Sequence, residues 1–249
     1  MRIRLDQLLT ERGLVRSRAE AQALIHAGAV DLDGNRRLKP GQLVAQDASV
    51  SLVEKPRWAS RAGAKLEHAL DAFGVDPAGW ATLDAGASTG GFTDVLLARG
   101  VRIVYAVDVG RAQLIQRLRE DPRVVSMERT NLRELRELPE RIDLVTLDLS
   151  FIGLGLVLPA VRSLLADDGR VIALVKPQFE AGRDDVPRGG VVVDPLVHER
   201  VVREVTLAAE AVGLYAWGTD RSPITGSDGN VEFLLHLRTA PRDPTRVML

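Results

Sequence analysis

A glycine-rich stretch at residues 83–93, with the sequence LDAGASTGGFT, constrains the fold of this chain more than any other feature. It has the pattern of an apolar strand end that passes through a turn into a helix. Glycines let a backbone approach a ligand closely, and the start of a helix offers unpaired N–H donors. The spacing does not match G-x-G-x-x-G, and no Gly-Lys-Ser/Thr follows as a phosphate-binding loop requires. The stretch therefore predicts a nucleotide-like cofactor site and argues against a pyrophosphate ligand.

Strand and helix patterns alternate on both sides of this stretch. Apolar runs of strand length lie at 82–85, 103–107, 124–127, 144–147, 171–175, 214–218 and 231–237. Helical spacing is found at 60–74, 91–98, 113–119, 154–165 and 195–212. Such alternation predicts an α/β fold with a doubly wound, mostly parallel sheet, whose ligands bind at the carboxyl ends of the strands.

Composition narrows the class of protein. The chain has 249 residues, 45% of them hydrophobic, and a net charge of −1, so any basic surface must be local. It has no cysteine, which excludes disulfides and thiol catalysis, and its four histidines lack metal-ligand spacing, so we expect no metal. The start MRIRLDQLL is charged and no apolar run is long enough to span a membrane. We therefore expect a cytoplasmic protein that does not enter a membrane.

Residues 1–60 have the pattern of a separate small α+β domain. A helix is predicted at 3–13, and Ser17 with Glu20 forms a capping box that opens a second helix ending at Gly28. Short strands at 29–32 and 38–44 flank a turn signal, Asp33-Gly34-Asn35, and a further strand is predicted at 50–53. The charged, proline-containing segment near 54–60 is predicted to be the linker to a second domain at 61–249.

The segments RLDQLL, GLVRSR and GAVDLDG follow one another in the order found in S4-type RNA-binding domains, and residues 4–53 resemble such a domain. The resemblance implies that basic side chains on one face bind RNA phosphates, which suits arginine. Charge clustering alone would be equally consistent with a solvated surface. The candidate RNA-binding residues are Arg4, Arg16, Arg18, Arg36, Arg37 and Lys39.

Polar residues follow the ends of the predicted strands. Asp108 ends the second strand, where a carboxylate can accept the two hydroxyls of a ribose, although an aspartate there can also simply open a turn. Thr130 and Asn131 follow the third strand and are weaker candidates for contact with an adenine edge. Together with the glycine-rich stretch, these residues suggest a cofactor that carries adenosine.

Opposite charges end the fourth and fifth strands. Asp148 closes LVTLDLSF and Lys176 closes VIALVKPQF, so adjacent strands would bring the two side chains to one edge of the sheet. A lysine at a strand end often only covers apolar surface with its stem. However, only four of the 33 basic residues are lysine, and lysine loses its proton when buried more readily than arginine does. This scarcity favours a chemical role for Lys176.

The set Lys65, Asp148, Lys176 and Glu232, together with DAGASTGGFT, DLSFI, VKPQFE and SPITGSDGNVEF, is similar to the Lys-Asp-Lys-Glu tetrad of FtsJ-type ribose 2′-O-methyltransferases. With its S4-like start, the whole chain resembles the TlyA family, known both as haemolysins and as rRNA 2′-O-methyltransferases. The resemblance implies a Rossmann-like, S-adenosylmethionine-dependent methyltransferase domain and catalysis by the tetrad. It implies cofactor binding by Asp84, Gly86, Ala87, Ser88, Gly90, Gly91, Phe92, Asp108, Thr130 and Asn131.

The same resemblance implies a substrate: the ribose of an extruded cytidine in ribosomal RNA, free or within a ribosomal subunit, with the large subunit favoured. Lys176 would act there as a neutral base or as a cationic stabiliser, and the residues do not decide between these roles. Three alternatives stay open at this point: a non-catalytic RNA-binding or ribosome-assembly factor, a membrane-active haemolysin, and a dinucleotide oxidoreductase. The glycine spacing disfavours the last of these.

Overall fold

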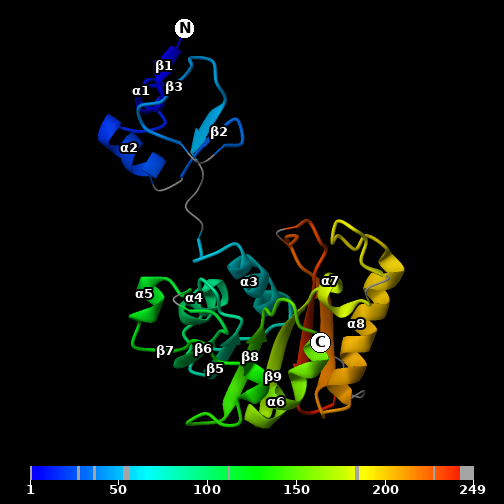
Figure 1. Cartoon of the computed structure of the whole chain (residues 1–249). Coiled ribbons are helices and arrows are strands. Elements are labelled where there is room, and N and C mark those ends of the chain that lie inside the picture. The colour runs from blue at the N-terminus through cyan, green and yellow to red at the C-terminus, as the bar shows by residue number, and fades with distance from the viewer. Residues whose placement is uncertain are drawn as a thin grey trace. The chain divides into compact units, whose positions relative to one another are not determined.

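A computed structural model describes residues 2–26, 29–35, 38–52, 57–111, 113–182, 185–226 and 228–241. The chain divides into two compact units, residues 1–57 and residues 58–249 (Figure 1). Each unit has its own hydrophobic core.

The first unit contains two short helices and two two-stranded sheets. Its elements are β1 (Arg2–Arg4), α1 (Leu5–Glu11), α2 (Arg18–His26), β2 (Val30–Leu32), β3 (Leu43–Ala45) and β4 (Val50–Leu52). Strand β1 pairs with β3, and β2 pairs with β4, both antiparallel. Leu5, Leu8 and Leu9 on α1 pack with Ile25 on α2 in a core that excludes water. The amphipathic spacing of these residues is therefore what holds the unit together.

Two predictions for this unit are wrong in part. The helix predicted at 3–13 starts at Leu5, because Ile3 pairs with Val44 in the β1–β3 ladder. The short strands predicted at 29–32 and 38–44 do not pair across the turn at Asp33-Gly34-Asn35. Strand β2 pairs with β4, the second predicted strand is reduced to β3, which pairs with β1, and the turn closes a single bridge between Leu32 and Asn35. The predicted capping box is confirmed in part: the Ser17 hydroxyl accepts the Glu20 N–H at 3.2 Å, whereas the Glu20 carboxylate accepts the N–H of Arg16 in place of that of Ser17.

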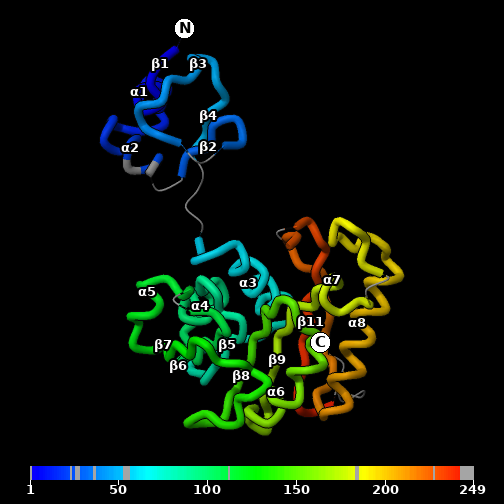
Figure 2. Tube along the Cα trace, viewed as in Figure 1, coloured from blue at the N-terminus to red at the C-terminus, as the bar shows by residue number. Residues whose placement is uncertain are grey.

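A seven-stranded sheet organises the second unit. Its strands are β5 (Ala81–Ala85), β6 (Ile103–Val107), β7 (Val124–Met127), β8 (Ile142–Leu147), β9 (Leu165–Val175), β10 (Tyr215–Arg221) and β11 (Phe233–Arg238). Their order is β10-β11-β9-β8-β5-β6-β7. The five strands from β9 to β7 are parallel, and β11 and β10 add an antiparallel edge. This confirms the predicted doubly wound, mostly parallel sheet. Figure 2 labels β11 and the five parallel strands along the chain trace.

Helices cover both faces of this sheet. They are α3 (Ala62–Ala72), α4 (Gly91–Ala98), α5 (Gln116–Arg119), α6 (Leu158–Leu164), α7 (Pro177–Glu180) and α8 (Pro195–Glu210), with 3₁₀ turns η1 (Leu132–Glu134) and η2 (Leu154–Leu156). Alternate residues of β9 face opposite cores: Ile172 packs with the α3 and α4 side, and Val171 with the α6 and α8 side. Within the described residues, no helix is both long and apolar enough to cross a membrane.

Two helices of this unit are shorter than predicted. The helix predicted at 113–119 starts at Gln116, because the Ile115 N–H donates to the Thr89 carbonyl in the glycine-rich loop. The helix predicted at 154–165 is divided into η2 and α6, and α6 has a proline in its first turn. Proline lacks the N–H that would continue a preceding helix, so a new helix begins there.

Candidate active site and basic cluster

The glycine-rich loop joins the ends of three parallel strands. Gly86 has φ +81°, and its N–H donates to the Val107 carbonyl at the end of β6 at 2.9 Å. A Cβ atom added to Gly86 would lie 2.4 Å from the carbonyl oxygen of Asp148, which follows β8. Only glycine can therefore bring the ends of β5 and β8 so close together.

Asp108 fixes this loop from the end of β6. One carboxylate oxygen accepts the Ser88 N–H at 2.8 Å, and the other accepts the Gly110 N–H at 2.7 Å. The second bond is the kind that a turn aspartate makes, and the first ties the residue to the glycine-rich loop. Each carboxylate oxygen keeps a further lone pair for a ligand.

A cavity of about 340 Å³ lies at these strand ends. It is lined by five of the predicted cofactor residues, namely Gly86, Ser88, Asp108, Thr130 and Asn131, and by Asp148. Val109, Gln113 and residues 149–152 also line it, and none of them was among the predicted cofactor residues, although 149–152 belong to the motif DLSFI. All but Gln113 directly follow the ends of β6 and β8, which is the signal that could have identified them.

A second cavity, of about 220 Å³, lies on the other side of the same loop. Ala87, Gly91 and Phe92 line it together with Asp148, Ser150 and Lys176. Gly86, Ser88, Asp148 and Ser150 line both cavities. The cavity beside Asp108 and the cavity beside Lys176 therefore adjoin the same part of the glycine-rich loop.

The four tetrad residues form two ion pairs. Lys176 at the end of β9 lies 2.6 Å from the Asp148 carboxylate, and its ammonium donates to the Ser150 hydroxyl at 3.2 Å. Lys65 on α3 pairs with Glu232, which directly precedes β11. Both lysines and Glu232 are buried. The predicted meeting of Asp148 and Lys176 at one sheet edge is confirmed, and each lysine has its own carboxylate.

Two predicted cofactor residues lie behind the loop. Asp84 is fully buried, and its carboxylate accepts the Thr93 hydroxyl at 2.6 Å and the Thr146 hydroxyl at 3.0 Å. Gly90 is the N-cap of α4, and a Cβ atom added there would meet the side chain of Leu118. We therefore place both residues in support of the loop, because their neighbours are protein groups.

Burial raises the pKa of Asp84 to about 6, against the opposing effect of its two threonine donors. The folded state thus holds the neutral carboxyl at pH values where the unfolded chain has already ionised it. The stabilisation is complete below about pH 4 and is lost as the pH rises through about 6, a change of about 3 kcal/mol. Asp84→Asn should remove this decline from urea-unfolding free energies measured between about pH 4 and pH 7.

The matched control for this variant is Asp168→Asn, which changes an exposed aspartate of the same unit. It should leave the pH dependence as in the wild type. If the free energy of unfolding depends on pH equally in the wild type and in Asp84→Asn, the decline does not come from Asp84.

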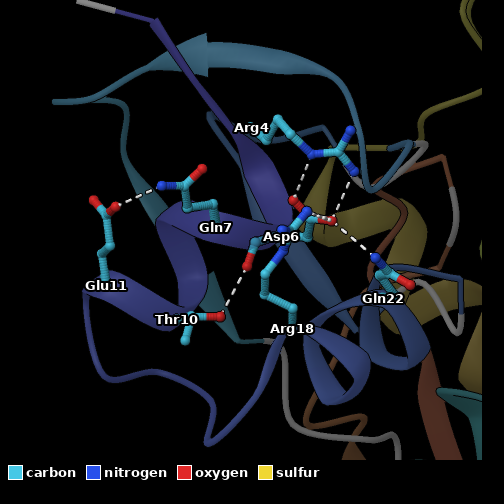
Figure 3. Close-up of polar contacts among 7 residues, drawn as sticks. All are labelled: Arg4, Asp6, Gln7, Thr10, Glu11, Arg18 and Gln22. Carbon is cyan, nitrogen blue, oxygen red and sulfur yellow. Dashed lines mark hydrogen bonds and ion pairs between the residues drawn. The ribbon is translucent and has the colours of Figure 1, made fainter.

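In the first unit, the buried carboxylate of Asp6 joins two of the predicted RNA-binding residues (Figure 3). Arg4 donates to both of its oxygens, from Nε at 3.0 Å and from a terminal nitrogen at 2.8 Å. Arg18 donates at 3.2 Å and Gln22 at 2.9 Å. Sequence reasoning missed Asp6, although its position two residues after Arg4 in RLDQLL was visible.

The other predicted RNA-binding residues have separate surroundings. Arg16 is exposed, and its N–H donates to the Glu20 carboxylate as part of the helix cap. Lys39 is also exposed. Arg36 and Arg37 lie outside the described residues. The structure therefore brings together Arg4 and Arg18 of this set.

The sheet order, the glycine-rich loop after β5 and the acidic residue after β6 define the fold of the S-adenosylmethionine-dependent methyltransferases. Such an enzyme from Mesorhizobium loti has this fold, with a TM-score of 0.54 over 70% of this chain and 97% of its own at 18% identity. Residues 58–239 match the family model of FtsJ-like methyltransferases, and residues 3–50 match that of the S4 domain.

Two similar proteins cover nearly the whole chain. The 16S/23S rRNA (cytidine-2′-O)-methyltransferase TlyA of Mycobacterium tuberculosis is 48% identical over 96% of this chain and 90% of its own length. A solved Streptococcus thermophilus structure, named as a hemolysin, covers 98% of this chain and 91% of its own, with 43% identity and a TM-score of 0.76. The chain belongs to the TlyA family of FtsJ-like methyltransferases.

Proposed function

We propose that this protein transfers a methyl group from S-adenosylmethionine to the 2′-hydroxyl of a cytidine ribose in ribosomal RNA. The observation that carries the proposal is the Lys176–Asp148 pair, which lies at the strand ends beside the glycine-rich loop. The name of the 48% identical relative supports the same reaction. Residues 1–60 would serve as the RNA-binding domain with its linker, and residues 61–249 as the methyltransferase domain.

The residues of the larger cavity suit S-adenosylmethionine. Gly86 lines the cavity, and the Asp108 carboxylate can accept ribose hydroxyls with its remaining lone pairs. Thr130 and Asn131 would lie beside the adenine. When bound, the cofactor supplies a methyl group activated by its sulfonium charge. The lining residues suit a nucleoside, and the sequence after the strand has no phosphate-binding motif, which fits this ligand better than a dinucleotide.

Lys176 is the residue we assign to the target hydroxyl. A ribose hydroxyl is a weak nucleophile until its proton is removed or strongly hydrogen-bonded. Ser150 accepts one of the three N–H groups of the ammonium, and the Asp148 carboxylate lies 2.6 Å away as its ion-pair partner. A remaining N–H group would meet the ribose oxygen. Asp148 thus acts by orienting Lys176, whether the lysine accepts the proton or stabilises the developing charge.

Lys65 and Glu232 would complete the site, because Glu232 precedes β11 at Phe233, which pairs with Val175 next to Lys176. Both are buried and held against each other, so they present a fixed pair to the substrate. Buried ion pairs stabilise a fold poorly compared with apolar residues, so retention of two such pairs at one sheet edge favours a functional role.

The RNA state that accepts the methyl group can be tested directly. Labelled methyl from S-adenosylmethionine is followed into protein-free 16S rRNA, protein-free 23S rRNA, 30S subunits and 50S subunits, with Lys176→Ala as the inactive control. Because the relative is named for both rRNAs, we expect incorporation into RNA from at least one subunit, with the large subunit as the first candidate. A ribosomal substrate would also place the protein in the cytoplasm. Equal incorporation by wild type and Lys176→Ala would contradict the proposal.

A further inference from the structure

The buried carboxylate of Asp6 has an unusual set of partners. It is 0% exposed and accepts four hydrogen bonds from three side chains (Figure 3). Arg4 precedes α1, whereas Arg18 and Gln22 lie on the first two turns of α2. The bonds from Arg4, the strongest influence, hold the pKa of Asp6 well below its usual range against the effect of burial. The carboxylate is therefore charged at neutral pH.

Among the described residues, the two arginines use fewer than half of their donors on other side chains. A guanidinium has five N–H groups. Arg4 uses two of them on Asp6, and Arg18 uses one. Their side chains are 44% and 53% exposed, so the remaining donors reach solvent. Two guanidinium groups and one carboxylate leave the cluster with a charge of +1.

We propose that Asp6 is a positioning residue that holds Arg4 and Arg18 side by side as a preformed fork for RNA phosphate. This inference rests on the proposed function, because it requires that the first unit binds RNA. A free arginine side chain loses rotamer freedom when it binds, whereas one already fixed on a carboxylate has lost it beforehand. Asp6 thereby strengthens RNA binding even though its own charge repels RNA.

The proposal and simple electrostatics predict opposite changes in RNA affinity for one substitution. Asp6→Asn removes a negative charge close to the RNA surface while keeping the size of the side chain. Electrostatic attraction alone would then tighten RNA binding. Loss of the fork would weaken it, because an amide oxygen and a neutral NH₂ group cannot hold two guanidinium groups. The sign of the change therefore separates the two accounts.

The experiment measures binding of the full chain to protein-free 23S rRNA by filter binding at several KCl concentrations. The matched control is Glu11→Gln, which removes one negative charge from an exposed residue of the same helix. We expect Glu11→Gln to bind as tightly as the wild type or up to about threefold tighter. We expect Asp6→Asn to bind at least about fivefold more weakly, since charge-assisted contacts to phosphate are lost. Asp6→Asn binding as tightly as Glu11→Gln would overturn the proposal.

The salt dependence gives a second readout that a purely structural role would not change. Removing one phosphate contact lowers the slope of log K against log[salt] by about one. Arg18→Ala should show this reduction, and Asp6→Asn should show a reduction of similar size because the fork no longer meets its phosphate. An unchanged slope for Asp6→Asn would show that Asp6 only joins α1 to α2, and the proposal would fall.

Arg18→Lys tests the fork without depending on whether Asp6→Asn folds. Arg18 is more than half exposed, and its replacement leaves Asp6 paired with Arg4. Lysine keeps the charge but not the planar fork, so we expect weaker binding, close to that of Arg18→Ala. Wild-type affinity of Arg18→Lys would contradict the fork even if Asp6→Asn failed to fold. If Arg4→Ala and Arg18→Ala both leave RNA affinity unchanged, the assigned RNA contacts fail too. If they weaken binding and Asp6→Asn does not, only the positioning role fails.

Discussion

Lys176→Ala is expected to lower the rate of methyl transfer by at least about a hundredfold, the range that a positioned acid or base contributes. The lysine is buried beside the cavity, and its ammonium is directed by Asp148 and Ser150. Alanine removes the ammonium that we assign to the ribose oxygen. The loss should fall on the chemical step, measured as single-turnover transfer of labelled methyl at saturating cofactor and RNA, while RNA affinity stays within about twofold.

Two further variants make this prediction specific. Arg203→Ala removes an exposed cation on α8 and should leave the rate unchanged. Lys176→Arg keeps a cation that cannot lose its proton. Substantial activity of Lys176→Arg would assign a stabilising role to the charge, whereas inactivity would favour a neutral base. A rate within about threefold of wild type for Lys176→Ala would show that the residue is not part of the reaction.

Gly86→Ala should have the second-largest effect, and it should act on stability and cofactor binding together. The residue has φ +81°, and its added Cβ would lie 2.4 Å from the backbone oxygen of Asp148. Backbone atoms on both sides cannot move away as a flexible side chain can. We expect a loss of at least about 3 kcal/mol in the free energy of unfolding, or a displaced loop that no longer binds the cofactor.

Gly79→Ala is the matched control. Gly79 has a similar φ of +78°, but an added Cβ would meet no atom within 4 Å. It should therefore show only the cost of the left-handed backbone, about 1 kcal/mol, with cofactor affinity unchanged. Urea unfolding and calorimetric titration of S-adenosylmethionine measure both quantities. Similar losses in the two variants would mean that the contact with the end of β8 has no importance.

The sequence predicted the sheet and its functional edge well because short patterns determine them. Apolar runs such as 171–175 are buried on both faces, so their length and composition identify them as parallel strands. Asp148 and Lys176 end two such strands, and parallel topology alone brings strand ends together. The glycine-rich stretch was also readable, because positive φ and close backbone approach are properties that glycine alone supplies.

Contacts between residues far apart in the sequence could not be predicted in the same way. Nothing local to 30–32 indicates that β2 pairs with β4, because three-residue strands have no register signal beyond their turn. Asp84 lies within the cofactor motif, yet its carboxylate turns towards Thr93 and Thr146, which only the packed structure determines. The role of Asp6 was missed for the same reason. Its partners on α2 are 12 and 16 residues away, so a window centred on RLDQLL does not contain them.

The most direct test of the central claim is to map the methyl group itself. Ribosomal subunits and protein-free rRNA are incubated with the protein and S-adenosylmethionine, digested with nucleases and analysed by mass spectrometry of the nucleosides and fragments. We predict 2′-O-methylcytidine at a defined rRNA position, dependent on cofactor and absent with Lys176→Ala. Methylation of a base atom, or no methylation of any rRNA or subunit by the folded wild-type protein, would contradict the account.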